Sequence, residues 1–199
     1  MATYASIKYD MDLSSNATGA GPMTLLSTQT ASSSSTLSFT SGIDSTYDEY
    51  IFKFYDIHPA TNNVDFQVNF RDGSSAYDAT KTSSVFYTYA DEADTTGDVA
   101  VSYLASADLA QSTGVQQIAL DVGSDNDESL CGTLQLFAPS STTFVKHFIG
   151  NISFSQSDDV QRIDYVAGYF NTTSAVDALQ FKFSSGNIDA GTITLYGIS

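Results

Sequence analysis

Hydrophobic and polar residues alternate along much of this chain. In the segment VDFQVNFR, the apolar residues Val64, Phe66, Val68 and Phe70 are separated by Asp, Gln and Asn. Strict alternation of this kind predicts a β-strand with one face buried and the other in water. Residues 162–171 alternate in the same way, with Ile, Tyr, Ala and Tyr at the odd positions and Asp, Val, Gly and Phe at the even ones.

Further short segments predict strands separated by turns. They are TLLSTQT and TLSFT within 23–40, YIFKFYDI at 50–57, SVFYTYA at 84–90, 115–122 and 130–138. Residues 144–154 fit one long strand bent at Gly150 or a hairpin. We expect the last segments, ALQFKFSS and GTITLYGI, to form a hairpin that turns at Gly186 and Asn187. Only residues 99–111 have a pattern that fits a short helix as well as a strand.

About ten to twelve short strands without alternating helices are typical of an all-β fold. We therefore predict an antiparallel β-sandwich, jelly-roll-like, formed as a single domain by residues 23–199. Residues 1–22 are polar and mixed, and we predict an N-terminal arm or edge strand there. Composition agrees with strands, because Ser and Thr make up about a quarter of the chain and Asp outnumbers Glu by twenty to three.

The charge balance narrows the choice of partners. A formal net charge of −16 rests on 23 acidic residues and only seven Lys and Arg. Nucleic-acid binding needs clustered cations that neutralise phosphates, so we expect no nucleic-acid partner. The N-terminal segment has no apolar core of a secretory signal, and no apolar run is long enough for a membrane-spanning helix. We expect a protein made in a cytoplasm that does not insert into membranes.

Motifs for catalysis are absent from the sequence. There is no GxSxG, HExxH, GxGxxG or GxxxxGK[ST] segment, and His58 and His147 stand far apart in the chain. The lone Cys131 lies in the apolar run LCGTLQLF, where a free thiol usually packs as a small core residue. We predict that the protein is not an enzyme. A polysaccharide-degrading activity based on a pair of Asp residues ranks last among the alternatives.

One acidic loop carries the oxygen ligands that calcium prefers. The segment DVGSDNDES supplies Asp121, Asp125, Asp127 and Glu128. Its spacing is not that of an EF-hand, so a solvated loop is the first interpretation and a calcium site the alternative. No other cofactor is expected.

Aromatic residues are numerous, with 12 Tyr, 13 Phe and no Trp. Most Phe fall at alternating strand positions and are assigned to the core. Tyr87, Tyr89, Tyr165 and Tyr169 lie on predicted strands, and an amphipathic ring suits both subunit interfaces and sugar stacking. These four tyrosines are therefore the interface candidates.

Two segments carry a resemblance to known proteins. The C-terminal FKFSSGNIDAGTITLYGIS (181–199) is similar to the ends of structural proteins of tailed bacteriophages, especially marine and cyanobacterial ones. The block SGIDSTYDEYIFKFYDIHPATNNVDFQVNFRDGSS (41–75) resembles the early half of the same proteins. Such proteins serve as fibres, tail-tip components or head decorations, and they offer no catalytic residues to transfer.

The resemblance implies a protein of the virion. We expect an exterior fibre or tail-associated adhesion module that forms a homo-oligomer, with a trimer as the preferred form. Its partners would be other virion proteins and a host surface glycan. The alternative is a capsid decoration protein that stabilises the head through its N-terminal arm and one sheet.

Overall fold

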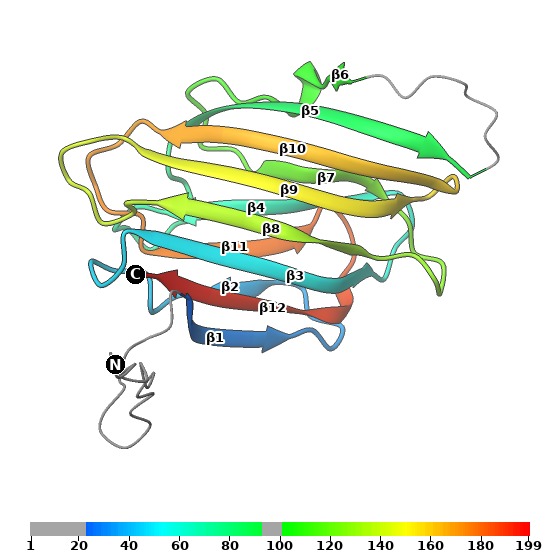
Figure 1. Ribbon diagram of the computed structural model, residues 1–199, viewed down its shortest axis with the longest axis horizontal. Coiled ribbons are helices and arrows are strands. Elements are labelled where there is room, and N and C mark those ends of the chain that lie inside the picture. Colours follow the sequence, from blue (N-terminus) through cyan, green and yellow to red (C-terminus); the bar gives the residue numbers. More distant parts are fainter. Residues whose placement is uncertain (1–22, 93–100) are drawn as a thin grey trace, which may run out of the picture.

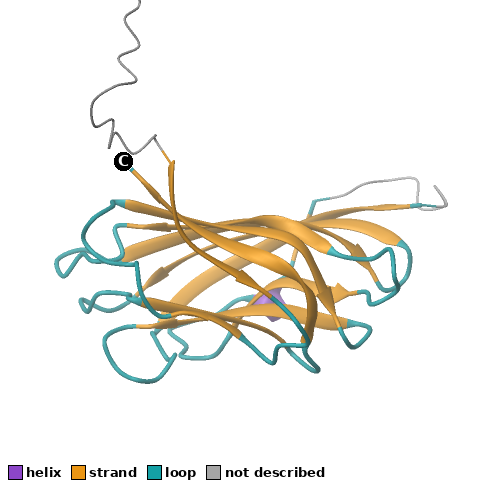
Figure 2. Ribbon diagram, turned by 90° about the horizontal axis from the view of Figure 1, so that it is seen from below, coloured by secondary structure: helices purple, strands orange, loops and turns teal. Residues whose placement is uncertain are grey.

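The computed structural model describes residues 23–92 and 101–199, and these form a two-layered antiparallel β-sandwich (Figures 1 and 2). The predicted arm at 1–22 lies outside the described residues. The larger layer, here the large sheet, has the order β1 (Met23–Thr30), β12 (Ile188–Ile198), β3 (Glu49–Pro59), β8 (Leu130–Phe137), β9 (Lys146–Gln156), β10 (Val160–Phe170), β5 (Lys81–Asp91) and β6 (Ser102–Tyr103). The small sheet has the order β2 (Leu37–Phe39), β11 (Ala178–Phe183), β4 (Val64–Arg71) and β7 (Gln116–Val122).

The two layers are joined along one side. Val122 of β7 pairs with Gln156 of β9, so the small sheet continues into the large one at that point. The strand pairings among the described residues are all antiparallel, as the sequence pattern predicts. The prediction of an all-β antiparallel sandwich is confirmed, and its twelve described strands fall within the expected range.

The core between the layers is built from the alternating apolar residues. Val64, Phe66, Val68 and Phe70 of β4 are all buried, as the alternation predicts. Phe181 of β11 lies at the centre, in ring contact with four other phenylalanines, which are Phe39, Phe52, Phe54 and Phe66. Buried aromatic rings of this size contribute much of the apolar area that stabilises a small sandwich.

The predicted C-terminal hairpin is wrong. β11 pairs with β4 and β2 in the small sheet, whereas β12 pairs with β1 and β3 in the large sheet. The turn at Gly186, where φ is +71°, therefore carries the chain from one layer to the other. Alternation shows which side of each strand is apolar, but two strands that face a shared core from opposite layers have the same pattern as two paired strands.

The central segment 144–154 forms one strand rather than a hairpin. β9 continues through Gly150 from Lys146 to Gln156 and pairs along its length with β8 and β10. In the segment for which a short helix was an alternative, the described residues 101–111 contain the two-residue strand β6 followed by a short 3₁₀ turn, η1 (Ala105–Ala107).

Cys131 does not pack in the core. Its side chain is exposed on β8, because the inward positions of that strand are Leu130, Leu134 and Leu136. Cys131 Sγ accepts a hydrogen bond from Asp56 N at 3.3 Å. Inward and outward positions alternate within the apolar run LCGTLQLF, and Cys131 occupies an outward position.

Candidate functional site

The most distinctive surface of the molecule is the outward side of four neighbouring strands of the large sheet, β8, β9, β10 and β5. We call it the outer face. The strand register places the odd-numbered residues of β8, β9 and β10 and the even-numbered residues of β5 on it together. None of these side chains is Lys, Arg, Asp or Glu. They are Cys131, Thr133, Gln135, Phe137, His147, Ile149, Asn151, Ser153, Ser155, Gln161, Ile163, Tyr165, Ala167, Tyr169, Thr82, Ser84, Phe86, Thr88 and Ala90.

The outward side of the small sheet has a different character. It carries Asp65 and Arg71 on β4, Asp121 on β7 and Lys182 on β11. Charged side chains of this kind are usual on the solvated side of an antiparallel sheet. On a chain with a net charge of −16, the outward positions of β5, β8, β9 and β10 therefore form a broad surface free of formal charge.

Large apolar side chains are exposed in the middle of the outer face. Phe86 is 43% exposed and Ile149 is 49% exposed. Tyr103 of β6, whose strand pairs with β5 at Phe86, is 65% exposed. Grouped apolar side chains on a surface mark sites that another molecule covers.

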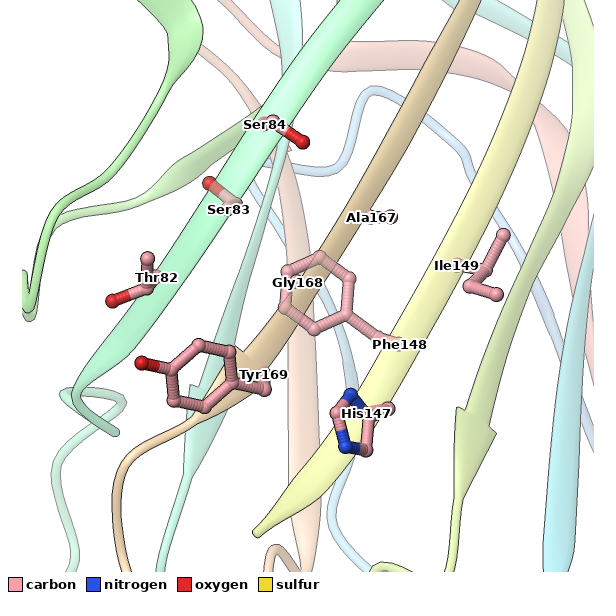
Figure 3. A pocket seen from close by; sticks show the side chains of 9 residues that line it. All are labelled: Thr82, Ser83, Ser84, His147, Phe148, Ile149, Ala167, Gly168 and Tyr169. Atoms are coloured by element: carbon pink, nitrogen blue, oxygen red, sulfur yellow. The ribbon is translucent and has the colours of Figure 1, made fainter.

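A hollow of about 460 Å³ lies in this face between β5, β10 and β9 (Figure 3). It lies over Gly168, between a row formed by Ser84, Ala167 and Ile149 and a row formed by Thr82, Tyr169 and His147. Beyond the Ala167 row, outside the lining of the hollow, the ring of Phe86 stacks on that of Tyr165, with centroids 4.9 Å apart. On the other side His147 and Tyr169 stand next to each other, with ring centroids 6.2 Å apart. The strand rise places the two aromatic pairs about 13 Å apart along β10.

The floor of the hollow is set by Gly168. A Cβ at this position would lie 2.5 Å from the ring of Phe148 on the inner side and 2.7 Å from the carbonyl oxygen of Thr82. Glycine therefore lets the Phe148 ring pack directly under β10.

A polar network borders one end of the hollow. Gln111, whose backbone has a φ of +49°, donates from Nε2 to Thr82 Oγ1 at 2.6 Å and to the Tyr169 hydroxyl at 3.3 Å. Asn171 donates to Gln111 Oε1. These bonds fix the orientation of the Tyr169 ring at the wall.

The four tyrosines predicted as interface residues fall on opposite sides of the large sheet. Tyr165 and Tyr169 lie on the outer face, and Tyr169 lines the hollow. Tyr87 and Tyr89 lie on the other side of β5, with their rings 6.1 Å apart. The guanidinium of Arg162 stands over the Tyr87 ring at 4.0 Å.

The predicted calcium ligands are engaged with the protein rather than gathered around one point. The Glu128 side chain is buried and accepts a hydrogen bond from Asp125 N at 2.6 Å, and Asp121 accepts one from Gln156 at 3.2 Å. Asp127 lines a separate hollow of about 390 Å³ beside His58. Among residues 23–92 and 101–199, no group of three or more His, Cys, Asp or Glu side chains is placed to hold a metal ion.

Buried ionisable groups serve the fold from inside the sandwich. Lys81 and Lys146 flank Phe170 across three strands, and both are fully buried. Lys81 Nζ donates to Asn69 Oδ1 at 2.8 Å and to the carbonyl of Ala79 at 3.2 Å. Burial lowers the pKa of Lys81 to about 8 and also lowers the pKa of Lys146.

Asp164 is also buried, and it accepts hydrogen bonds from Arg162 Nε at 2.6 Å and from Leu120 N at 3.2 Å. Burial raises the pKa of Asp164 to about 6, although the hydrogen bond and charge of Arg162 oppose the rise. Neither histidine hydrogen-bonds to a serine or cysteine side chain within the described part of the chain. His58 contacts the carbonyl of Asp125 and the carboxylate of Asp189, and His147 lies next to Tyr169.

Sequence reasoning missed Ile149 and Ala167, which line the hollow, and Phe86, which lies beside it. The alternation in 162–171 places Tyr, Ala and Tyr on one side of a strand, which is a signal for a gap between two rings. The neighbours of that gap come from β5 and β9, and their register is not written in the local pattern.

In the described residues, no helix is long and apolar enough to cross a membrane. Comparison with known proteins gives no relative for this fold: no protein-family model, no curated protein and no solved structure matches the chain.

Proposed function

We propose that this chain is an exterior structural protein of a tailed-phage particle, a fibre or tail-associated adhesion module that assembles as a homo-oligomer. The observation that carries the structural part of the proposal is the outer face, a broad uncharged surface with exposed aromatic and aliphatic side chains on an otherwise acidic protein. Such a surface is stabilised when a partner covers it.

The phage part of the proposal depends on the two segments that resemble phage structural proteins. Residues 41–75 include β3 and β4, and residues 181–199 include β12 and the end of β11. β3 pairs with β12 in the large sheet, and β4 pairs with β11 in the small sheet. The two segments therefore form one contiguous part of the sandwich, which supports treating their resemblance as a single signal.

The rest of the molecule suits a particle component. A sandwich with a phenylalanine core is rigid, and its loops can vary without disturbing the sheets. Its single cysteine permits no internal disulfide, so the fold does not depend on an oxidising environment. The described residues bring together no nucleophile and base that would suggest catalysis.

Antibodies raised against the full chain test the proposal. Immunogold labelling of tailed-phage particles from the source of this sequence should mark the tail or its fibres, and purified protein should adsorb to host cells. Labelling of the head, together with binding to expanded capsids, would assign the decoration role instead. Particles that contain no chain detectable by labelling or by mass spectrometry would refute the virion role.

A further inference from the structure

We infer that the outer face packs against the outer face of a second copy of this chain, with the Phe86–Tyr165 ridge of each copy seated in the Ala167 hollow of the other. This inference rests on the assembly role proposed above and names the partner of that surface. It also assigns a two-fold symmetry to the contact, because each copy both gives a ridge and receives one.

The absence of charge identifies the partner. Two copies that each carry −16 repel one another, and a carboxylate buried against a like-charged surface is costly to desolvate. A surface free of carboxylates avoids this cost when two such copies meet. A sugar-binding surface has no such requirement, since carboxylates are good acceptors for sugar hydroxyls. The exclusion of all twenty Asp and three Glu from the outward positions of four strands therefore favours a second copy.

Shape supports the same partner. The Phe86 and Tyr165 rings are nearly parallel, with 9° between their planes, and Phe86 is 43% exposed, so the pair forms a ridge above the sheet. Ala167, two residues along β10, leaves the adjoining hollow of about 460 Å³. A ridge next to a hollow is complementary to itself when the partner is turned by 180°.

The size of the face matches a protein contact. Four strands about 4.8 Å apart and about ten residues long cover roughly 600 Å² in plan. Standard protein interfaces bury about 800 Å² on each partner, and side-chain relief raises the accessible area above the plan area. On the side of β3 the uncharged face ends at Glu49 and Lys53, which supply the polar rim that interfaces usually have.

The same reasoning revises the trimer expected from the sequence. In a three-fold ring the outer face of one copy would meet a different surface of the next. The outward side of the small sheet carries Asp65, Arg71, Asp121 and Lys182, so it offers no uncharged counterpart. A face-to-face dimer places uncharged surface against uncharged surface.

Sedimentation velocity of the full chain tests the inference. Wild-type protein should be a dimer at micromolar concentration, and Ala167→Arg and Ile149→Glu should each weaken the dimer about a hundredfold or more by burying an unpaired charge. Ser185→Arg adds the same positive charge as Ala167→Arg, but it does so at an exposed turn between β11 and β12, away from the outer face. This variant should remain dimeric. Circular dichroism of each variant verifies that it is folded.

A mixing experiment tests the ridge-in-hollow geometry directly. Phe86→Glu alone should be monomeric, like Ala167→Arg. When the two variants are mixed, Arg at position 167 of one copy meets Glu at position 86 of the other, while the second ridge and hollow remain native. Native mass spectrometry should then detect the heterodimer in preference to either homodimer.

Several outcomes would overturn the inference. They are a wild-type chain that stays monomeric at about 100 µM, a trimer, a dimer that ignores outer-face substitutions, and a mixture that fails to pair. If the monomer instead binds neutral oligosaccharides, with NMR shifts at Phe86, Tyr165 and Ala167, the face is a glycan site. These results are independent of virion labelling, so failure of the dimer and failure of the phage role are separable.

Discussion

The ring of Phe86 on β5 stacks on the ring of Tyr165 on β10, with centroids 4.9 Å apart and planes 9° apart. A similar stack joins Phe66 and Phe181 in the core, at 5.9 Å and 13°. The first pair is partly open to water, whereas both rings of the second are fully buried. The same stacking arrangement therefore occurs both in the core of the sandwich and on its surface.

Truncating the core ring should unfold the protein far more readily than truncating the surface ring. Phe181→Ala removes contacts with four phenylalanines and leaves a cavity, so we expect a loss of about 3–5 kcal/mol in the free energy of unfolding. Phe86→Ala loses one stacked neighbour and should cost about 1 kcal/mol. Urea unfolding at a protein concentration low enough to keep both variants monomeric measures the difference. Equal losses would show that the outer face is part of the core.

Adding one methyl group at Gly168 should also destabilise the fold. A Cβ there would lie 2.5 Å from the Phe148 ring and 2.7 Å from the Thr82 carbonyl oxygen, and the backbone atom is not free to move away. We expect Gly168→Ala to cost about 1–3 kcal/mol. Ala167→Gly next to it removes a methyl group from an exposed position and provides the matched control. Thermal unfolding that ranks the control below Gly168→Ala would contradict the tight contact.

Lys81 should make the stability depend on pH in alkaline solution. Its pKa is lowered from 10.5 to about 8 by burial, so between these values the unfolded chain binds a proton that the folded chain has lost. This difference raises the stability as the pH rises through the window, by at most about 1.4 kcal/mol per pH unit. The neutral amine still donates to Asn69 and Ala79.

The variant Lys81→Met isolates this contribution. Tyrosines titrate in the same range, so the quantity to follow is the difference in unfolding free energy between wild type and variant at each pH. That difference should increase from pH 8 towards pH 10.5 in favour of the wild type. A constant difference would mean that the pKa of Lys81 is the same in the folded and unfolded states.

Local patterns were sufficient for the strands and for the side of β4 that is buried. They were not sufficient for β10, where both sets of alternating residues contain aromatic and small side chains. The fold buries the set with Arg162, Asp164, Val166 and Phe170 and exposes the set with Tyr165 and Tyr169. Charged residues usually mark the side of a strand that faces water. In β10 the charged residues Arg162 and Asp164, two residues apart in the sequence, form an ion pair on the buried side instead.

Long-range pairing was also beyond the local pattern. The chain from β11 to β12 reads as a hairpin, yet the two strands belong to different layers. The outer face depends on the order β8, β9, β10, β5, in which β5 joins the sheet from about seventy residues upstream of β10 in sequence. The uncharged character of each strand is visible in the sequence, but the surface exists only once these strands are side by side.

The pair formed by Arg162 and Asp164 gives the last prediction. Arg162→Met leaves the fully buried carboxylate of Asp164 with the Leu120 amide as its remaining partner, and we expect a loss of about 3–5 kcal/mol at pH 7. The second substitution Asp164→Asn removes the charge and keeps an acceptor for that amide, so the double variant should regain most of the loss.

The pKa of Asp164, already about 6, should rise further in Arg162→Met. A raised carboxyl pKa means that the folded state takes up a proton first, so this variant should gain stability as the pH falls from 7 towards 4. Urea unfolding across that range measures both effects, and a double variant no more stable than Arg162→Met would show that Arg162 acts through its packing on Tyr87 instead of through its charge.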